Sequence, residues 1–264
     1  TIHGFDIYFG LIGSNDENSP ALFRDSTKIE TSPDQRLLTK RYTDEAAKFI
    51  TANKSKPFFL YLAYSMPHVP VAVSSDFAGT SEQELYGDAV QELDWSVGKI
   101  LDTLKALGLD SNTVVVFTSD NGPNRKHMTV GATHYGDPAW EGGSALPFSG
   151  YKWDYQQEGG MRVPCIIRWP GVIPSGIVCK EVASSMDFYV TFSGIADIPL
   201  PQDRIIDGKN IYDLMTGKSG AVSPYDGFFY TKCFSGDSNS KVIVLRSGKW
   251  KYKRVWADDR LYDL

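Results

Sequence analysis

The residues best suited to chemistry follow short apolar runs of the chain. The β-branched run Val114–Thr118 ends in Ser119, Asp120, Asn121 and Gly122. An aspartate beside an asparagine offers one charged and one neutral oxygen ligand, which suits a hard cation such as Ca²⁺ or Mg²⁺. Open α/β sheets bind ligands at the carboxyl ends of their strands. Asp120 and Asn121 are therefore candidate metal ligands, although Asn-Gly is also a common turn that closes a strand.

Two further loops carry side chains that could bind an anion. His68 lies within Met66–Pro70, where two prolines fix the backbone around one histidine, as a site requires. A structural histidine is the alternative. Lys152 comes six residues before the glycine-containing segment Glu158–Pro164. An ordinary surface lysine is the alternative there.

A long glycine-rich connection spans residues 121–160 and shows little periodicity. Loops of this length inside a compact domain are usually functional. Arg125 begins a short basic cluster just after the Asp-Asn pair, which suits an anionic substrate or simply a solvated loop. His134 could also face a pocket, and no pattern in the sequence decides its role.

The elements that must position these loops alternate between helix and strand. Apolar spacing predicts helices over 33–53 and 81–107, and apolar runs predict strands over 58–64 and 114–118. This order predicts an α/β fold with a doubly wound, mixed but mainly parallel sheet flanked by helices. Further elements are predicted at residues 165–169 (strand), 187–196 and 211–215 (helices).

The pattern of apolar residues changes toward the C-terminus. Short alternating runs separated by Ser-Gly turns predict a small antiparallel meander: residues 228–233, 241–246 and 250–255. We therefore expect residues 1–220 to belong to the α/β domain and residues 221–264 to begin a small, incomplete C-terminal antiparallel subdomain.

Composition excludes several classes of protein. The 264 residues are 42% hydrophobic and 22% charged, a typical globular composition. The net charge of −5 argues against nucleic acid as a partner. No apolar run approaches the roughly 18 residues of a membrane span. Three scattered cysteines, Cys165, Cys179 and Cys233, are too few for a disulfide framework or a zinc cluster.

Several motifs, in this order, resemble those of the sulfatases, in particular the arylsulfatase A-like branch of the alkaline phosphatase superfamily. They lie at His3–Gly10, Met66–Pro70, Gly87–Asp94, Ser119–Gly122, Glu158–Pro164, Arg246–Tyr252 and Leu261–Leu264. The resemblance implies a metal ion, Ca²⁺ rather than Mg²⁺, bound by Asp120 and Asn121. It also implies that His68 and Lys152 are catalytic and contact the sulfate and the leaving oxygen. We expect Arg125 and His134 to bind substrate beside them.

The departures from the family pattern are equally informative. The family nucleophile is a formylglycine made from Cys or Ser in a Cys/Ser-x-Pro-x-Arg motif, and no such motif occurs here. Two upstream aspartate ligands are absent as well. We therefore expect a fragment that lacks the N-terminal formylglycine motif and is inactive alone. The spacing from Lys152 to Glu158 is also one residue longer than the family pattern.

Three functions stay open at this stage. The first is hydrolysis of a sulfate ester, small molecule or glycan, by a sulfatase. The second is a phosphoesterase or phosphonate hydrolase of the same superfamily, and the third is a noncatalytic module that binds sulfated glycans. The family resemblance predicts a secreted, periplasmic or lysosomal protein. The sequence does not identify the ester, because specificity would lie in the loop 122–157.

Overall fold

The structure, a computed structural model, describes four stretches of the chain: residues 4–124, 142–230, 242–255 and 258–264. Contacts divide the chain into two compact units: residues 1–113 with 123–144, and residues 114–122 with 145–264. Among the helices in the described stretches, none combines the length and apolar character needed to cross a bilayer.

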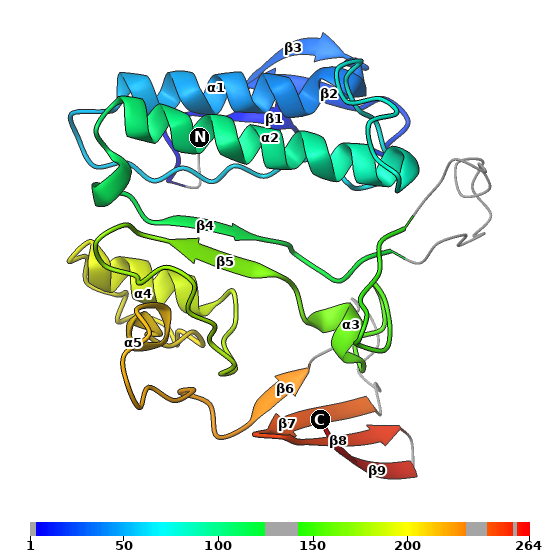
Figure 1. Ribbon diagram of the computed structural model, residues 1–264, viewed down its shortest axis with the longest axis vertical. Helices are drawn as coiled ribbons and strands as arrows, with labels where there is room; N and C mark the ends of the chain where they lie inside the picture. Colours follow the sequence, from blue (N-terminus) through cyan, green and yellow to red (C-terminus); the bar gives the residue numbers. More distant parts are fainter. Residues whose placement is uncertain (1–3, 125–141, 231–241, 256–257) are drawn as a thin grey trace. The chain divides into compact units, whose positions relative to one another are not determined.

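Two long helices form the main part of the first unit. Helices α1 (Leu38–Ala52) and α2 (Glu84–Ala106) pack against each other (Figure 1). A short 3₁₀ helix, η1 (Gln35–Leu37), leads into α1. The buried apolar side chains of α1 recur every four residues, as an amphipathic helix requires: Leu38, Tyr42, Ala46 and Ile50. After α2 the chain leaves the helix at Gly108, whose φ of +70° suits glycine. Both predicted helices are confirmed.

A small antiparallel sheet completes the first unit. Its strands are β1 (Phe9–Leu11), β2 (Ala21–Arg24) and β3 (Thr27–Thr31), in that order. Leu22 of β2 is fully buried against Leu38 and Tyr42. Leu62 and Tyr64 pack onto the same cluster. This core therefore anchors the segment that leads into the His68 loop.

The predicted strand over residues 58–64 is wrong. The segment alternates between side chains that pack on the core and side chains that face outward, as a strand would. Phe59 and Tyr61 are 61% and 72% exposed. Within the described part of the chain, however, no neighbouring strand pairs with it, and a strand needs such a partner for its backbone hydrogen bonds.

The second unit begins with a pair of strands. β4 (Val115–Thr118) and β5 (Cys165–Arg168) pair antiparallel, with Val115 opposite Arg168 and Thr118 opposite Cys165. Every strand pair in the described ranges is antiparallel, so the mainly parallel sheet that we predicted is not observed there. The reason is that the chain turns back after β4 and re-enters beside the end it left, whereas parallel neighbours need a crossover to the opposite end.

Two helices cover this strand pair. α4 (Asp187–Ile195) and α5 (Tyr212–Met215) confirm the helices predicted for this region. Their core consists of Ile211, Leu214 and Met215 packed with Val114, Ile167, Ile173, Phe188, Phe192 and Ala221. Because Val114 and Ile167 come from the β4 and β5 segments, this core fixes the strand pair that leads into the Asp120 loop.

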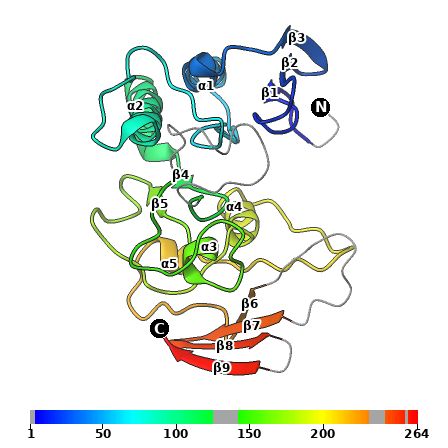
Figure 2. The same cartoon turned by 90° about the vertical axis from the view of Figure 1, so that its right-hand side faces the viewer.

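A four-stranded antiparallel meander ends the chain (Figure 2). Its strands are β6 (Phe228–Tyr230), β7 (Val242–Ser247), β8 (Trp250–Val255) and β9 (Asp258–Asp263). The first three coincide with the alternating runs in the sequence, whereas β9 was not predicted. The domain boundary expected near residue 220 stays a prediction.

Candidate functional site

The loop after β4 presents the two predicted metal ligands at the surface. Asp120 is exposed and Asn121 is half-buried. The Asn121 Nδ2 donates a hydrogen bond to Asp120 Oδ1 at 2.9 Å, and Ser119 Oγ donates to the Asn121 carbonyl oxygen at 3.0 Å. These bonds hold the two side chains next to each other on a tight turn. The loop thus has the turn geometry as well as the candidate ligands.

Backbone contacts hold this loop against a short helix, α3 (Glu158–Met161), and we call these contacts the clasp. The Gly122 amide donates to the Gly160 carbonyl oxygen at 3.0 Å. A Cβ at Gly122 would overlap the Gly159 carbonyl oxygen, so only glycine fits this close approach. The glycines of the two motifs therefore position Asp120 directly beside α3.

Lys152 lies on a loop that is held by the same helix. The Gly159 amide donates to the Ser149 carbonyl oxygen at 2.8 Å, which fixes the start of the loop. Lys152 is half-buried, and its Nζ lies 5.3 Å from the centre of the Trp153 ring, a cation–π contact. In the stretches that the structure describes, no carboxylate forms an ion pair with Lys152.

A buried carboxylate at the start of α3 ties this helix to the C-terminal sheet. Glu158 Oε1 accepts hydrogen bonds from Lys251 Nζ at 2.7 Å and from the Tyr230 hydroxyl at 2.9 Å. Its Oε2 accepts from Arg246 at 3.2 Å. The three partners come from β6, β7 and β8, and Lys251 is only 4% exposed. We call this set, Glu158 with Tyr230, Arg246 and Lys251, the Glu158 cluster.

The cations determine the charge state of this cluster. Burial by itself raises the pKa of Glu158, but the hydrogen bonds from Lys251 and Tyr230 and the positive charges of Lys251 and Arg246 outweigh it, so the pKa lies below its ordinary value. Burial and the neighbouring Glu158 carboxylate raise the pKa of Tyr230 to about 12. At neutral pH Glu158 is therefore ionised, and Tyr230 stays protonated and donates its hydrogen bond.

His68 occupies a defined position in the first unit. Its Nδ1 lies 3.0 Å from Asn15 Oδ1 and 2.7 Å from the carbonyl oxygen of Val69. Asn15 is buried, with 4% exposure, and comes from the loop between β1 and β2. No pattern in the sequence indicates this partner, because 53 residues separate the two side chains.

The structure brings together only part of the predicted site. Asp120, Asn121 and the Lys152 loop belong to the second unit and share contacts with α3, whereas His68 belongs to the first unit. Arg125 and His134 lie outside the described residues. The roles predicted for all six residues stay predictions.

The oxygen atoms of Asp120 and Asn121 are of the kind that Ca²⁺ prefers, but they are too few for a complete shell. Ca²⁺ takes about six to eight oxygen ligands. Within the described ranges, no group of three or more His, Cys, Asp or Glu side chains could hold a metal ion. The pair therefore fits as one part of a coordination shell that needs further ligands.

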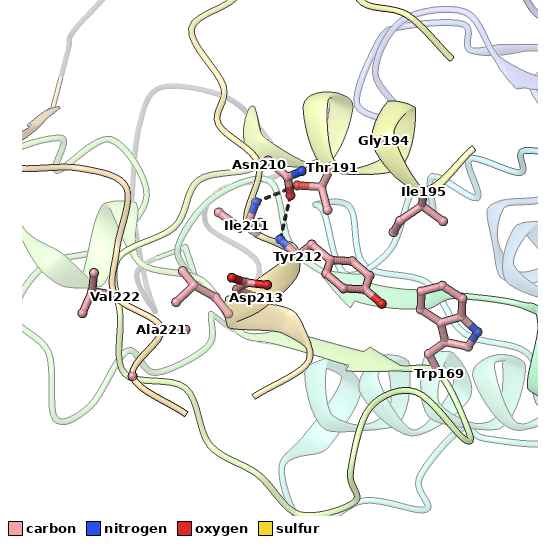
Figure 3. A pocket seen from close by; sticks show the side chains of 12 residues that line it. Trp169, Thr191, Gly194, Ile195, Asn210, Ile211, Tyr212, Asp213, Ala221 and Val222 are labelled. Carbon is pink, nitrogen blue, oxygen red and sulfur yellow. Dashed lines mark hydrogen bonds between the residues drawn. The ribbon is translucent and has the colours of Figure 1, made fainter. Parts of the chain in front are cut away.

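A cavity of about 760 Å³ in the second unit is not part of this site (Figure 3). Trp169, Thr191, Asn210 and Tyr212 line it. Because β4 and β5 run antiparallel, Trp169 follows the end of β5 that lies opposite the start of β4, whereas Asp120 follows the end of β4. The cavity's polar groups are also occupied locally: the Thr191 hydroxyl accepts from the Ile211 amide at 3.0 Å.

The comparisons with known proteins all point to the same family. The model of the family described as Sulfatase matches residues 2–198. Human steryl-sulfatase is 45% identical over 184 residues, which cover 69% of this chain and 30% of that protein. Mouse N-acetylgalactosamine-6-sulfatase is 40% identical over 276 residues, which cover 97% of this chain and 50% of that protein. The chain thus spans half or less of the length of these relatives.

The fold comparison agrees. A solved structure from work on the metabolism of multiple glycosaminoglycans by Bacteroides thetaiotaomicron matches with a TM-score of 0.71 and 25% identity. The match covers 90% of this chain and 51% of the other. The α/β fold class is thereby supported, although the strand pairs observed here are antiparallel.

Proposed function

Because the chain belongs to the sulfatase family, we propose that it forms part of a sulfate ester hydrolase, which releases an alcohol and sulfate. The observation that carries this proposal is the backbone clasp in which α3 holds both the Asp120 loop and the Lys152 loop. A carboxylate–amide pair and a lysine without an ion-pair partner among the described residues thereby lie on two loops that are hydrogen-bonded to one helix.

The chemistry of a sulfate ester suits this set of residues. The ester carries negative charge on its nonbridging oxygens, and further charge develops on the leaving oxygen during cleavage. Lys152 is a compact cation that would bind the sulfate group. His68 would contact the leaving oxygen. Arg125 and His134 would add contacts to the substrate.

Asp120 and Asn121 would hold a Ca²⁺ ion together with ligands from elsewhere in the protein. When bound, such an ion neutralises negative charge on an ester's oxygen atoms. The nucleophile of the proposed reaction is a formylglycine, which the printed sequence does not contain. We infer that it comes from a part of the protein outside these 264 residues. The ester itself and the compartment, secreted, periplasmic or lysosomal, stay predictions.

The test is release of sulfate from 4-nitrocatechol sulfate. The protein that carries this chain would be co-expressed with a formylglycine-generating enzyme and assayed with Ca²⁺, beside Asp120→Ala. We expect the variant to lose about 100-fold or more of kcat/KM, because a metal contributes several kcal/mol to such a transition state. Asp102→Ala, at an exposed position of α2, is the matched control and should keep full activity.

Other results would replace the proposal. A folded protein that cleaves a phosphate or phosphonate ester but no sulfate ester would be a phosphoesterase of the same fold. A protein that binds sulfated glycans and releases no sulfate would be a noncatalytic binding module. Equal activity of Asp120→Ala and the control would exclude Asp120 from the metal site.

A further inference from the structure

The hydrogen bonds around His68 define which of its ring nitrogens carries the proton. A neutral imidazole has one N–H donor and one lone-pair acceptor, and its partners decide between the two tautomers. Both partners of the His68 ring among the described residues contact Nδ1, and one of them, the Val69 carbonyl oxygen, can only accept. The other partner, Asn15, has an amide that could face either way, so its orientation needs a separate argument.

Gln35 fixes the orientation of the Asn15 amide. The Gln35 Nε2 lies 2.8 Å from the backbone carbonyl oxygen of Asn15, which can only accept, so the Gln35 NH₂ group must face it. The Gln35 Oε1 then accepts from Asn15 Nδ2 at 3.0 Å. The Asn15 Oδ1 is therefore left to face His68 Nδ1, at 3.0 Å, as an acceptor.

The same amide also holds the loop that carries His68. Asn15 Nδ2 lies 3.4 Å from the His68 carbonyl oxygen and 3.5 Å from that of Pro70. These contacts are long, but they require the same orientation of the amide, with nitrogen toward the two carbonyl groups. Asn15 itself is 4% exposed, so water does not compete freely for its partners.

We infer that Asn15, oriented by Gln35, is a positioning residue that locks His68 in its Nδ1–H tautomer and presents Nε2 as the atom that exchanges protons. No described residue hydrogen-bonds to Nε2. In the hydrolase that we propose above, on which the catalytic part of this inference rests, Nε2 would be the atom that contacts the leaving oxygen. The tautomer itself does not depend on that function.

The test reads the tautomer directly. The protein would be labelled with ¹⁵N-histidine, and the ring nitrogens would be observed by long-range ¹H–¹⁵N correlation. The chain has only four histidines, so a His68→Gln spectrum assigns the His68 signals. In the neutral imidazole we expect a protonated, pyrrole-type Nδ1 and an unprotonated, pyridine-type Nε2. A neutral ring that carries its proton on Nε2 in the unmodified protein would overturn the inference, whatever the variants show.

Three variants separate positioning from general disruption. Asn15→Leu removes the acceptor, and we expect the His68 signals to shift toward a mixture of tautomers and kcat/KM to fall about 10- to 100-fold, as for other residues that orient a site histidine. Asn15→Asp keeps an acceptor oxygen and should keep the Nδ1–H tautomer. Asn18→Leu, at an exposed position of the same loop, is the matched control and should change neither readout.

The outcomes distinguish this inference from the proposed function. An Nδ1–H tautomer that is lost in Asn15→Leu, in a protein that cleaves no sulfate ester, supports the positioning role and contradicts only the proposed function. Sulfate ester hydrolysis that depends on His68, with an unchanged tautomer in Asn15→Leu, contradicts the positioning role alone. If Asn15→Leu does not fold, the unmodified protein and Asn15→Asp still carry the test.

Discussion

Replacing Glu158 by glutamine removes the negative charge that lies between a buried lysine, Lys251, and a half-buried arginine, Arg246. Arg246 and Lys251 are directly opposite each other on β7 and β8, where like charges repel. Glu158 contacts both, at 3.2 and 2.7 Å. At an effective dielectric constant of about 20, the Lys251 contact alone has a Coulomb energy of about 6 kcal/mol, part of which is offset by desolvation.

The expected loss of stability is large for a single substitution. Breaking a buried ion pair by removing one partner costs about 3–5 kcal/mol, because the remaining charge is left uncompensated. For a protein of this size, that corresponds to a decrease in Tm of about 6–20 °C. Thermal unfolding of Glu158→Gln followed by circular dichroism measures this decrease. Glu82→Gln, at an exposed position, is the matched control and should unfold like the unmodified protein.

The pH dependence gives the same prediction a second test. The pKa of Glu158 in the folded protein lies below its ordinary value of 4.5. The stabilisation from Glu158 is therefore complete above about pH 4.5 and is lost as the pH falls through the folded-state pKa. The difference between Glu158→Gln and the unmodified protein should decrease over this acidic range. A Tm within 2 °C of the control at pH 7 would refute the reasoning.

Two further predictions concern the loops that α3 holds. Gly122→Ala should lower the free energy of unfolding by about 1–3 kcal/mol, because the added Cβ overlaps the Gly159 carbonyl oxygen. Urea denaturation should detect this loss. Unchanged stability would mean that the backbone contact between Gly122 and α3 is absent in solution. Lys152→Ala should raise KM and lower kcat for an aryl sulfate, by about 100-fold in kcat/KM, whereas Lys180→Ala, at an exposed position, should have no effect.

Local patterns in the sequence were sufficient to predict helices α1 and α2. The apolar spacing of α1 and α2 and the glycine that follows α2 are encoded within a few residues, so these predictions are confirmed. The strand over residues 58–64 and the parallel sheet failed for a different reason. Both depend on which segments pair, and the alternation of side chains within one segment does not specify its neighbour.

The candidate site shows the same difference: residues adjacent in the sequence were predicted, whereas contacts between distant residues were not. The turn after β4 was recognisable because Asp120, Asn121 and Gly122 are adjacent in the sequence. The contacts that orient His68 and Glu158 were not recognisable, since 53 residues separate Asn15 from His68 and 93 separate Glu158 from Lys251. Buried polar side chains find such partners only once the chain has folded, and composition and spacing do not identify the pairs.

The clasp between Gly122 and α3 has a consequence for how such a protein diversifies. Its contacts are made by backbone atoms, so they do not restrict the side chains of the loop between Gly150 and Gln157. Under the proposed function, substitutions in that loop would therefore change which esters are accepted, while Asp120 keeps its position. For an engineer, the positions of this loop other than Lys152 are the ones to randomise first.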